Sequence, residues 1–95
     1  MLHKDFGLIS VIMAAYNAEA TIGQSIQSVL NQTYSNLELL VIDDCSQDGT
    51  ATLAEKIAKT DSRVRLIFNE KNSGVSYTRK HGLKEAKGEW IAILD

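Results

Sequence analysis

Apolar and polar positions follow one another along the chain as short apolar runs separated by stretches of helical periodicity. Residues 8–14 form an apolar run interrupted only by Ser10, which is typical of a strand buried on both faces. Apolar side chains then recur at i, i+4, i+7 and i+8, the spacing of one face of an amphipathic helix. They are Ile22, Ile26, Val29 and Leu30. The polar segment 31–36 ends this helix.

The rest of the chain repeats the pattern. Residues 37–42 predict a second strand, and a second helix is marked by Leu53, Ala54, Ile57 and Ala58. A short strand is expected at 64–68, with Val64, Leu66 and Phe68 on one face. A polar loop at 69–74 precedes a third helix at 75–86, whose inward side chains we expect to be Val75, Leu83 and Ala86. Gly88 stops this helix before a fourth strand at 90–94.

Strands that alternate with helices in this way predict an α/β fold with a mainly parallel sheet and helices on both of its faces. The crossovers are expected to be right-handed. Spacing alone does not give the strand order, although successive strands are usually neighbours. We expect the tips of the second and fourth strands to lie side by side.

Composition excludes several classes of protein. A chain of 95 residues with 44% hydrophobic and 23% charged residues fits one small globular domain. A formal net charge of -2 without basic runs gives no field for nucleic acid. The single cysteine, Cys45, excludes an internal disulfide framework and a cysteine-rich zinc site.

Targeting signals are weak. No apolar run approaches the roughly 20 residues of a membrane helix. Residues 6–15 have the length of a signal-peptide core, but Asp5 and Ser10 oppose that interpretation, and a buried strand is favoured. The cytoplasm is the default location, and membrane association of a longer protein stays open.

Two strands end on acid: Asp43 and Asp44 follow the second, and Asp95 follows the fourth. In open α/β sheets this edge is where ligands bind. One acid of the pair is then free to accept hydrogen bonds from a ligand. Equally, both acids can simply cap the loop before the second helix. Asp95 can contribute to a divalent-cation site, but one carboxylate is too few for a site made of protein alone.

Two further segments offer candidate contacts. After the first strand come Ala14 and Ala15, small enough for a ligand to approach the backbone, and Tyr16, with a flat ring and a hydroxyl. The plainer interpretation is a loop tyrosine that packs on the domain. Before the third helix, Gly74 permits a bend and Arg79 can pair with a carboxylate or phosphate, although an exposed helical arginine is the commoner case.

Taken together and in order, these segments resemble the N-terminal half of family 2 glycosyltransferases. The resemblance rests on residues 9–17, 38–50 and 72 through 95, and covers the chain from about Leu8 onward. The most specific block is Val-Ile-Asp-Asp-Cys-Ser-Gln-Asp-Gly-Thr. The region around Arg79 is looser, with Tyr-Thr-Arg-Lys-His-Gly where the family often has Ala-Arg-Asn and a glycine. Ala14 stands where proline is common, and Cys45 where glycine is common.

The resemblance implies a GT-A, Rossmann-like fold, a nucleotide-diphosphate-sugar donor, most commonly a UDP-sugar, and Mg²⁺ or Mn²⁺. It also implies one role for each matching residue. Ala14, Ala15 and Tyr16 line the base pocket with Glu19 at its rim, Asp44 accepts from the base N–H, Asp43 supports the turn, Arg79 belongs to the donor site, and Asp95 is the first acid of an Asp-x-Asp motif near ribose and metal.

The resemblance further implies that the parent protein transfers a sugar to a hydroxyl acceptor, saccharide or lipid-linked, by one inverting displacement. The second motif acid, the acceptor half and the general base are then absent from residues 1–95, which form one truncated, donor-binding domain. We expect this fragment to be inactive, and its last strand to be an exposed edge that favours dimerisation.

Three rival interpretations come from other classes. A receiver-type signalling domain also uses paired acids and Mg²⁺, but its acid pair follows the first strand. A nicotinamide-binding domain needs a glycine-rich turn after the first strand, where this chain has Ala-Ala-Tyr-Asn-Ala-Glu-Ala. A non-catalytic, glycosyltransferase-like binding domain is the third, and only residues beyond Asp95 separate it from an enzyme.

Overall fold

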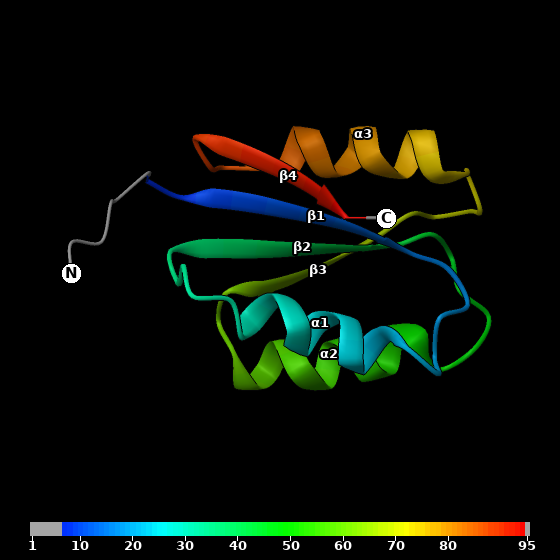
Figure 1. Cartoon of the computed structure of the whole chain (residues 1–95). Helices are drawn as coiled ribbons and strands as arrows, with labels where there is room; N and C mark the ends of the chain where they lie inside the picture. The colour runs from blue at the N-terminus through cyan, green and yellow to red at the C-terminus, as the bar shows by residue number, and fades with distance from the viewer. Residues whose placement is uncertain (1–6, 95) are drawn as a thin grey trace.

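A computed structural model describes residues 7–94 and shows one sheet between two layers of helices (Figure 1). The elements in chain order are β1 (Ile9–Ala15), α1 (Ile22–Leu30), β2 (Leu37–Asp43), α2 (Thr50–Thr60), β3 (Val64–Phe68), α3 (Val75–Glu85) and β4 (Trp90–Leu94). Every strand pairs with its neighbours in parallel. The predicted α/β alternation and parallel sheet are confirmed.

The strands lie in the order β3-β2-β1-β4. Since β1 lies between β2 and β4, the expectation that the tips of the second and fourth strands are neighbours is wrong. The chain steps outward from β1 to β3 and then returns to the other side of β1. Right-handed crossovers convert this reversal into helices on opposite faces. Figure 1 shows α1 and α2 below the sheet and α3 above it, which confirms that both faces are covered.

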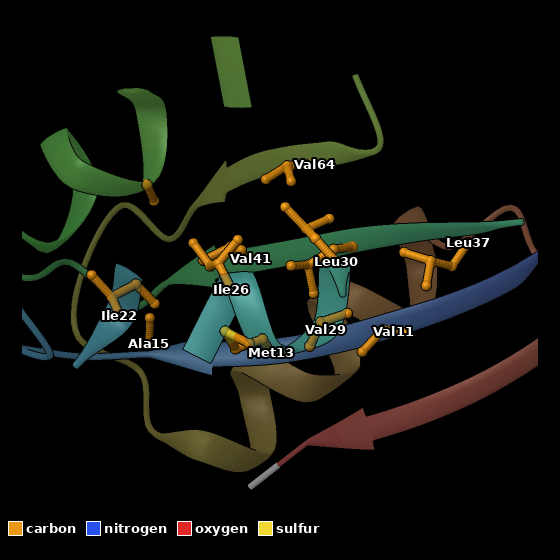
Figure 2. Packing of buried hydrophobic residues seen from close by; sticks show 12 residues of the cluster. Val11, Met13, Ala15, Ile22, Ile26, Val29, Leu30, Leu37, Val41 and Val64 are labelled. Atoms are coloured by element: carbon orange, nitrogen blue, oxygen red, sulfur yellow. The ribbon is translucent and has the colours of Figure 1, made fainter. Parts of the chain in front are cut away.

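The larger hydrophobic core lies between the sheet and the α1–α2 layer (Figure 2). All four apolar positions of α1 that share the helical spacing are buried, as predicted. They pack against alternate residues of β1 and β2, including Val11, Met13 and Val41. Burying a side chain of this size stabilises the fold by roughly 1.5–3 kcal/mol. This layer therefore holds the loops that follow β1 and β2 in place.

The opposite face carries a smaller core, formed by Ile12, Leu40 and Ile42. A β-carbon added to Gly82 of α3 would lie 2.7 Å from Cγ2 of Ile12 and 2.9 Å from Cδ1 of Ile42. The sheet-facing side of α3 is thus a surface of small residues, and the absence of a side chain at Gly82 allows the close approach.

This packing corrects the predicted inward face of α3. Val75 and Leu83 are 52% and 45% exposed, whereas Thr78 and Gly82 are buried. The prediction assumed that the large apolar side chains of α3 face the sheet. Because α3 approaches Ile12 closely, only small side chains fit between them. Of the three residues predicted, only Ala86 packs against the core.

The two edge strands also differ from a simple alternation. Val64 and Leu66 contact the larger core as expected, but Phe68 is 54% exposed, because it is the last residue of an edge strand. At the other edge, all five residues of β4 are exposed. Within residues 7–94, each helix is too short or too polar to cross a bilayer.

Candidate functional site

The carboxyl ends of β1, β2 and β3 meet at one edge of the sheet. Ala15 pairs with Asp43, and Asp43 pairs with Phe68. The ladder continues one residue further, since the backbone N–H of Asp44 donates to the carbonyl of Ala15 and that of Asn69 to the carbonyl of Asp43, at 2.8 and 2.9 Å. Residues that follow three different strands are therefore gathered at one place, the usual ligand-binding edge of such sheets.

A hollow of about 330 Å³ opens at this edge. Its lining comes from the β1 end, the β2 end and the start of α3: Ala14, Ala15, Tyr16, Asp44, Asn72, Gly74, Val75 and Thr78. The volume lies at the lower end of the range for small-molecule sites. The structure thus brings together the residues expected to line a base pocket with the acid expected to face it.

Asp44 is the charged group of this hollow. Its Oδ1 accepts from Nδ2 of Asn69 and from the N–H of Ser73, both at 2.8 Å, and its Oδ2 accepts from the N–H of Gly74 at 3.0 Å. Burial opposes ionisation, but these hydrogen bonds outweigh it and hold the pKa of Asp44 below its ordinary value of 3.8. Asp44 is therefore a carboxylate that only accepts hydrogen bonds.

Gly74 is essential to this arrangement, as its predicted role in a bend suggested. Its φ is +89°, a conformation that glycine adopts at little cost. The turn aims two successive N–H groups, from Ser73 and Gly74, at the same carboxylate. The loop before α3 is therefore folded around Asp44.

Asp43 has the structural role expected of it. It is 3% exposed, and its Oδ2 accepts from the N–H of Ser46 at 3.0 Å, which fixes the turn after β2. Its Oδ1 is buried and has no hydrogen-bond partner within the described part of the chain. Cys45, between Asp44 and this turn, has φ +60°, in the left-handed region that glycine favours.

Hydrogen bonds tie the loop after β1 to the loop after β2. The N–H of Asn17 donates to Oγ of Ser46, and its side-chain Oδ1 accepts from the N–H of Gln47, both at 2.9 Å. Oε1 of Glu19 accepts from the N–H of Gly49 at 3.1 Å. Asn17 thus links the two loops, and we expect these bonds to restrain the backbone that carries Tyr16.

Several predicted positions stand apart from the hollow. Thr21 occupies the N-cap of α1 and makes no side-chain capping bond. Glu19 and Arg79 do not line the hollow. Asp95 lies outside the described residues, as does any cation site built on it. Residues 7–94 contain no cluster of three or more His, Cys, Asp or Glu side chains that could hold a metal ion.

Two residues of the site were missed by sequence reasoning. Asn69 is 6% exposed and holds Asp44, and Thr78 lines the hollow. Asn69 directly follows β3, just as Asp44 follows β2. The rule that picked out residues at strand ends would have found Asn69 had it been applied to the third strand.

A second hollow, of about 250 Å³, adjoins the first at the β1–β4 boundary. Ala14 and Ala15 line both, and Thr21, Ser25 and Leu94 belong to the second. This is the point where the strand order reverses, where ligands bind in open α/β sheets. The two hollows thus share the end of β1 as a common wall.

Comparisons with known proteins agree with this geometry. Residues 10–95 match Glycosyl transferase family 2. Over 88 residues the chain is 50% identical to UDP-Glc:alpha-D-GlcNAc-diphosphoundecaprenol beta-1,3-glucosyltransferase WfgD of Escherichia coli, covering 93% of this chain and 34% of that protein. An uncharacterized glycosyltransferase of Haemophilus influenzae is 46% identical over 88 residues, with 93% and 35% covered. The chain thus spans about a third of the length of these curated relatives.

Solved structures show the same fold. S. aureus TarS 1-349 in complex with UDP-GlcNAc superimposes with a TM-score of 0.84 at 33% identity, over 92% of this chain and 26% of that one. The mannosyltransferase PcManGT of Pyrobaculum calidifontis, in complex with GDP-Man and Mn²⁺, gives 0.83 at 26% identity, over 90% and 26%. With a family match over residues 10–95, and Asp43 and Asp44 at the end of β2, the chain belongs to glycosyl transferase family 2.

Proposed function

We propose that this chain is the donor-binding half of an inverting glycosyltransferase and that its edge hollow binds the base of a nucleoside-diphosphate sugar. The observation that carries the proposal is the shared hollow of Tyr16 and Asp44 at the carboxyl ends of β1 and β2. The half-exposed ring of Tyr16 offers a face for a flat base. Uridine is the base that we propose.

The hydrogen bonds of Asp44 support a preference among bases. A carboxylate oxygen has two lone pairs. Among the described residues, two donors lie 2.8 Å from Oδ1, whereas the N–H of Gly74 donates to Oδ2 at 3.0 Å. The remaining acceptor site suits a base that presents an N–H at its edge, as uracil does at N3. Cytosine presents an unprotonated nitrogen there, so it would face Asp44 with a lone pair.

For the reaction, we propose that the diphosphate and sugar extend from the base hollow toward the end of β4. An acceptor hydroxyl then attacks the anomeric carbon while the bond to the diphosphate breaks, and a general base outside residues 1–95 takes the hydroxyl proton. A divalent cation, when bound near Asp95, would neutralise the leaving diphosphate. The chain's own contribution is to bind and orient the donor.

The same proposal leaves the acceptor open between a saccharide and a lipid-linked saccharide. A diphosphoundecaprenol-linked acceptor is named for the E. coli relative. The acceptor half would lie in the part of the parent protein that corresponds to the other two thirds of the relatives. Location in the cytoplasm and dimerisation through β4 stay predictions.

Calorimetric titration of the chain with UDP, CDP and GDP, with and without Mn²⁺, tests the proposal. We expect UDP to bind with a dissociation constant on the order of 1 mM, CDP to bind more weakly, and no sugar to be transferred. Equal affinities for UDP and CDP would contradict the assigned base contact. Sugar transfer by the chain alone would contradict the missing acceptor half.

A further inference from the structure

The carboxylate of Asp44 is held by a chain of hydrogen bonds that begins on α3, outside the base hollow. Nδ1 of His81 lies 2.7 Å from Oδ1 of Asn69, and Nδ2 of Asn69 lies 2.8 Å from Oδ1 of Asp44. His81 lines a different hollow, beside Phe68 and Tyr77. A partly exposed side chain is thus connected, through a buried amide, to the charged group of the donor site.

The direction of each hydrogen bond in this chain is fixed by its neighbours. The hydroxyl of Thr78 donates to the carbonyl of Gly74 at 2.8 Å, so it accepts from Nδ2 of Asn69, also at 2.8 Å. The second N–H of the same amide meets the carboxylate of Asp44. A flipped amide would turn its oxygen toward that carboxylate, which is unfavourable.

The orientation of the Asn69 amide determines which ring nitrogen of His81 carries a proton. Because both N–H groups of Asn69 are used, its Oδ1 faces the imidazole and needs a donor. Nδ1 of His81 must therefore carry a proton, whether the ring is neutral or charged. Neither His81 nor Thr78 belongs to the pattern by which the family was recognised, since both lie in the segment where the chain departs from it.

We propose that His81, acting through Asn69, is a positioning residue that orients Asp44 so that the remaining acceptor site of Oδ2 faces the base. Without the imidazole N–H, Oδ1 of Asn69 loses its donor, the amide is free to turn, and one of the three bonds that fix the carboxylate is lost. The consequence for base selectivity rests on the proposed function; the control of Asp44 by His81 does not.

Three variants separate positioning from a general structural role. His81→Phe keeps a ring of similar size and removes the donor. His81→Asn places an amide Nδ2 near the position of Nδ1 and restores it. Tyr77→Phe is the matched control, since it keeps the ring whose edge meets His81, with centroids 6.3 Å apart, and removes only a hydroxyl.

Two readouts are needed. The first is the NMR chemical shift of the backbone amides of Ser73 and Gly74 in the free protein, because both amides donate to the carboxylate of Asp44. Titration with UDP and CDP reports selectivity. We expect His81→Phe to shift both amide signals and to reduce the preference for UDP over CDP about 10-fold. We expect His81→Asn and Tyr77→Phe to resemble the unmodified protein, and the ¹⁵N spectrum of His81 to show a protonated Nδ1.

The outcomes are distinguishable. An unprotonated Nδ1, or unchanged Ser73 and Gly74 amides in His81→Phe, would overturn the positioning role. Equal losses for UDP and CDP, without rescue in His81→Asn, would also overturn it, since they indicate a loss of folded protein alone. If no variant and not even the unmodified protein binds a nucleotide, while the amides still shift only in His81→Phe, positioning is upheld and the proposed function fails.

Discussion

Ser10 and Glu38 are register partners on β1 and β2, and the hydroxyl of Ser10 donates a 2.5 Å hydrogen bond to Oε2 of Glu38. Both side chains are buried. Oε2 also accepts from the N–H of Lys87 at 2.7 Å, and the N–H of Gly88 donates to Oγ of Ser10 at 2.8 Å. This polar network lies near the amino ends of the strands, away from the hollow that Tyr16 and Asp44 line, and fixes where the chain leaves α3 and enters β4.

Removing Glu38 should therefore destabilise the whole domain. Glu38→Ala leaves the hydroxyl of Ser10 and the N–H of Lys87 without their acceptor. It also removes the 3.3 Å ion pair between Arg65 and Oε1, so that Arg65 retains only its contacts with Glu85 among the described residues. We expect a loss of about 2–3 kcal/mol in the free energy of unfolding, measured by urea denaturation. Glu85→Ala is the control, because the 45% exposed Glu85 also pairs with Arg65 at 3.3 Å and should cost less than about 0.5 kcal/mol. Similar losses in both variants would contradict the assignment.

Glu38 also predicts a dependence of stability on pH. Burial opposes its charge, but hydrogen bonds from Ser10, Lys87 and Arg65 prevail and hold its pKa below the ordinary 4.5. A depressed folded-state pKa contributes stability that is present above pH 4.5 and is lost as pH falls through the folded value. The stability difference between the unmodified protein and Glu38→Gln should thus be constant above pH 5 and should shrink below about pH 4.5. A difference that grows on acidification would refute this.

Two glycines in helices should respond oppositely to the same substitution. Gly82→Ala would place a β-carbon 2.7 Å from Ile12, and we expect a loss of about 1–3 kcal/mol. Gly23, inside α1, has nothing within 4 Å of such a carbon, so Gly23→Ala should gain about 0.5–1 kcal/mol. Thermal or urea unfolding measures both. A neutral Gly82→Ala would mean that α3 does not pack through its small face.

The positive φ of Cys45 destabilises the folded protein, and a glycine at this position would remove that strain. Its φ of +60° is disfavoured for a residue with a β-carbon by about 1–2 kcal/mol. After allowing for the greater freedom of an unfolded glycine, Cys45→Gly should stabilise the protein by about 0.5–1 kcal/mol. Cys45→Ala removes the thiol but keeps the β-carbon, and should bring no gain. Equal effects of the two substitutions would assign the change to the thiol instead.

The order and type of the elements could be predicted from the sequence because the spacing of apolar residues matches the pattern of buried side chains in the structure. Helix α1 buries every residue of its predicted stripe, and the strands β1 and β2 are apolar on both faces. Helix α3 was predicted in place but with the wrong face, since its contact depends on the absence of a side chain at Gly82 rather than on a large one. Strand order was not readable, because it is set by contacts between elements distant in sequence.

The residues of the proposed donor site could be predicted only in part from the sequence. Asp44, Tyr16 and Gly74 were found because each follows or precedes a recognisable element. The carboxylate's internal partners were not, since Asn69 acts through a contact 25 residues distant. Glu19 was expected at the rim of the base pocket, but its carboxylate accepts a hydrogen bond from the N–H of Gly49 in the adjacent loop. The two residues are 30 positions apart, so no local sequence pattern predicts this contact.

The donor-site account is tested most directly by titrating the protein and its Asp44→Ala variant with UDP in the presence of Mn²⁺. Asp61→Ala is the charge-matched control, since Asp61 caps the end of α2 and pairs with Arg63, and does not line the hollow. We predict that Asp44→Ala weakens UDP binding at least about 10-fold, and that Asp61→Ala binds like the unmodified protein. Undiminished affinity of Asp44→Ala for UDP would contradict the account.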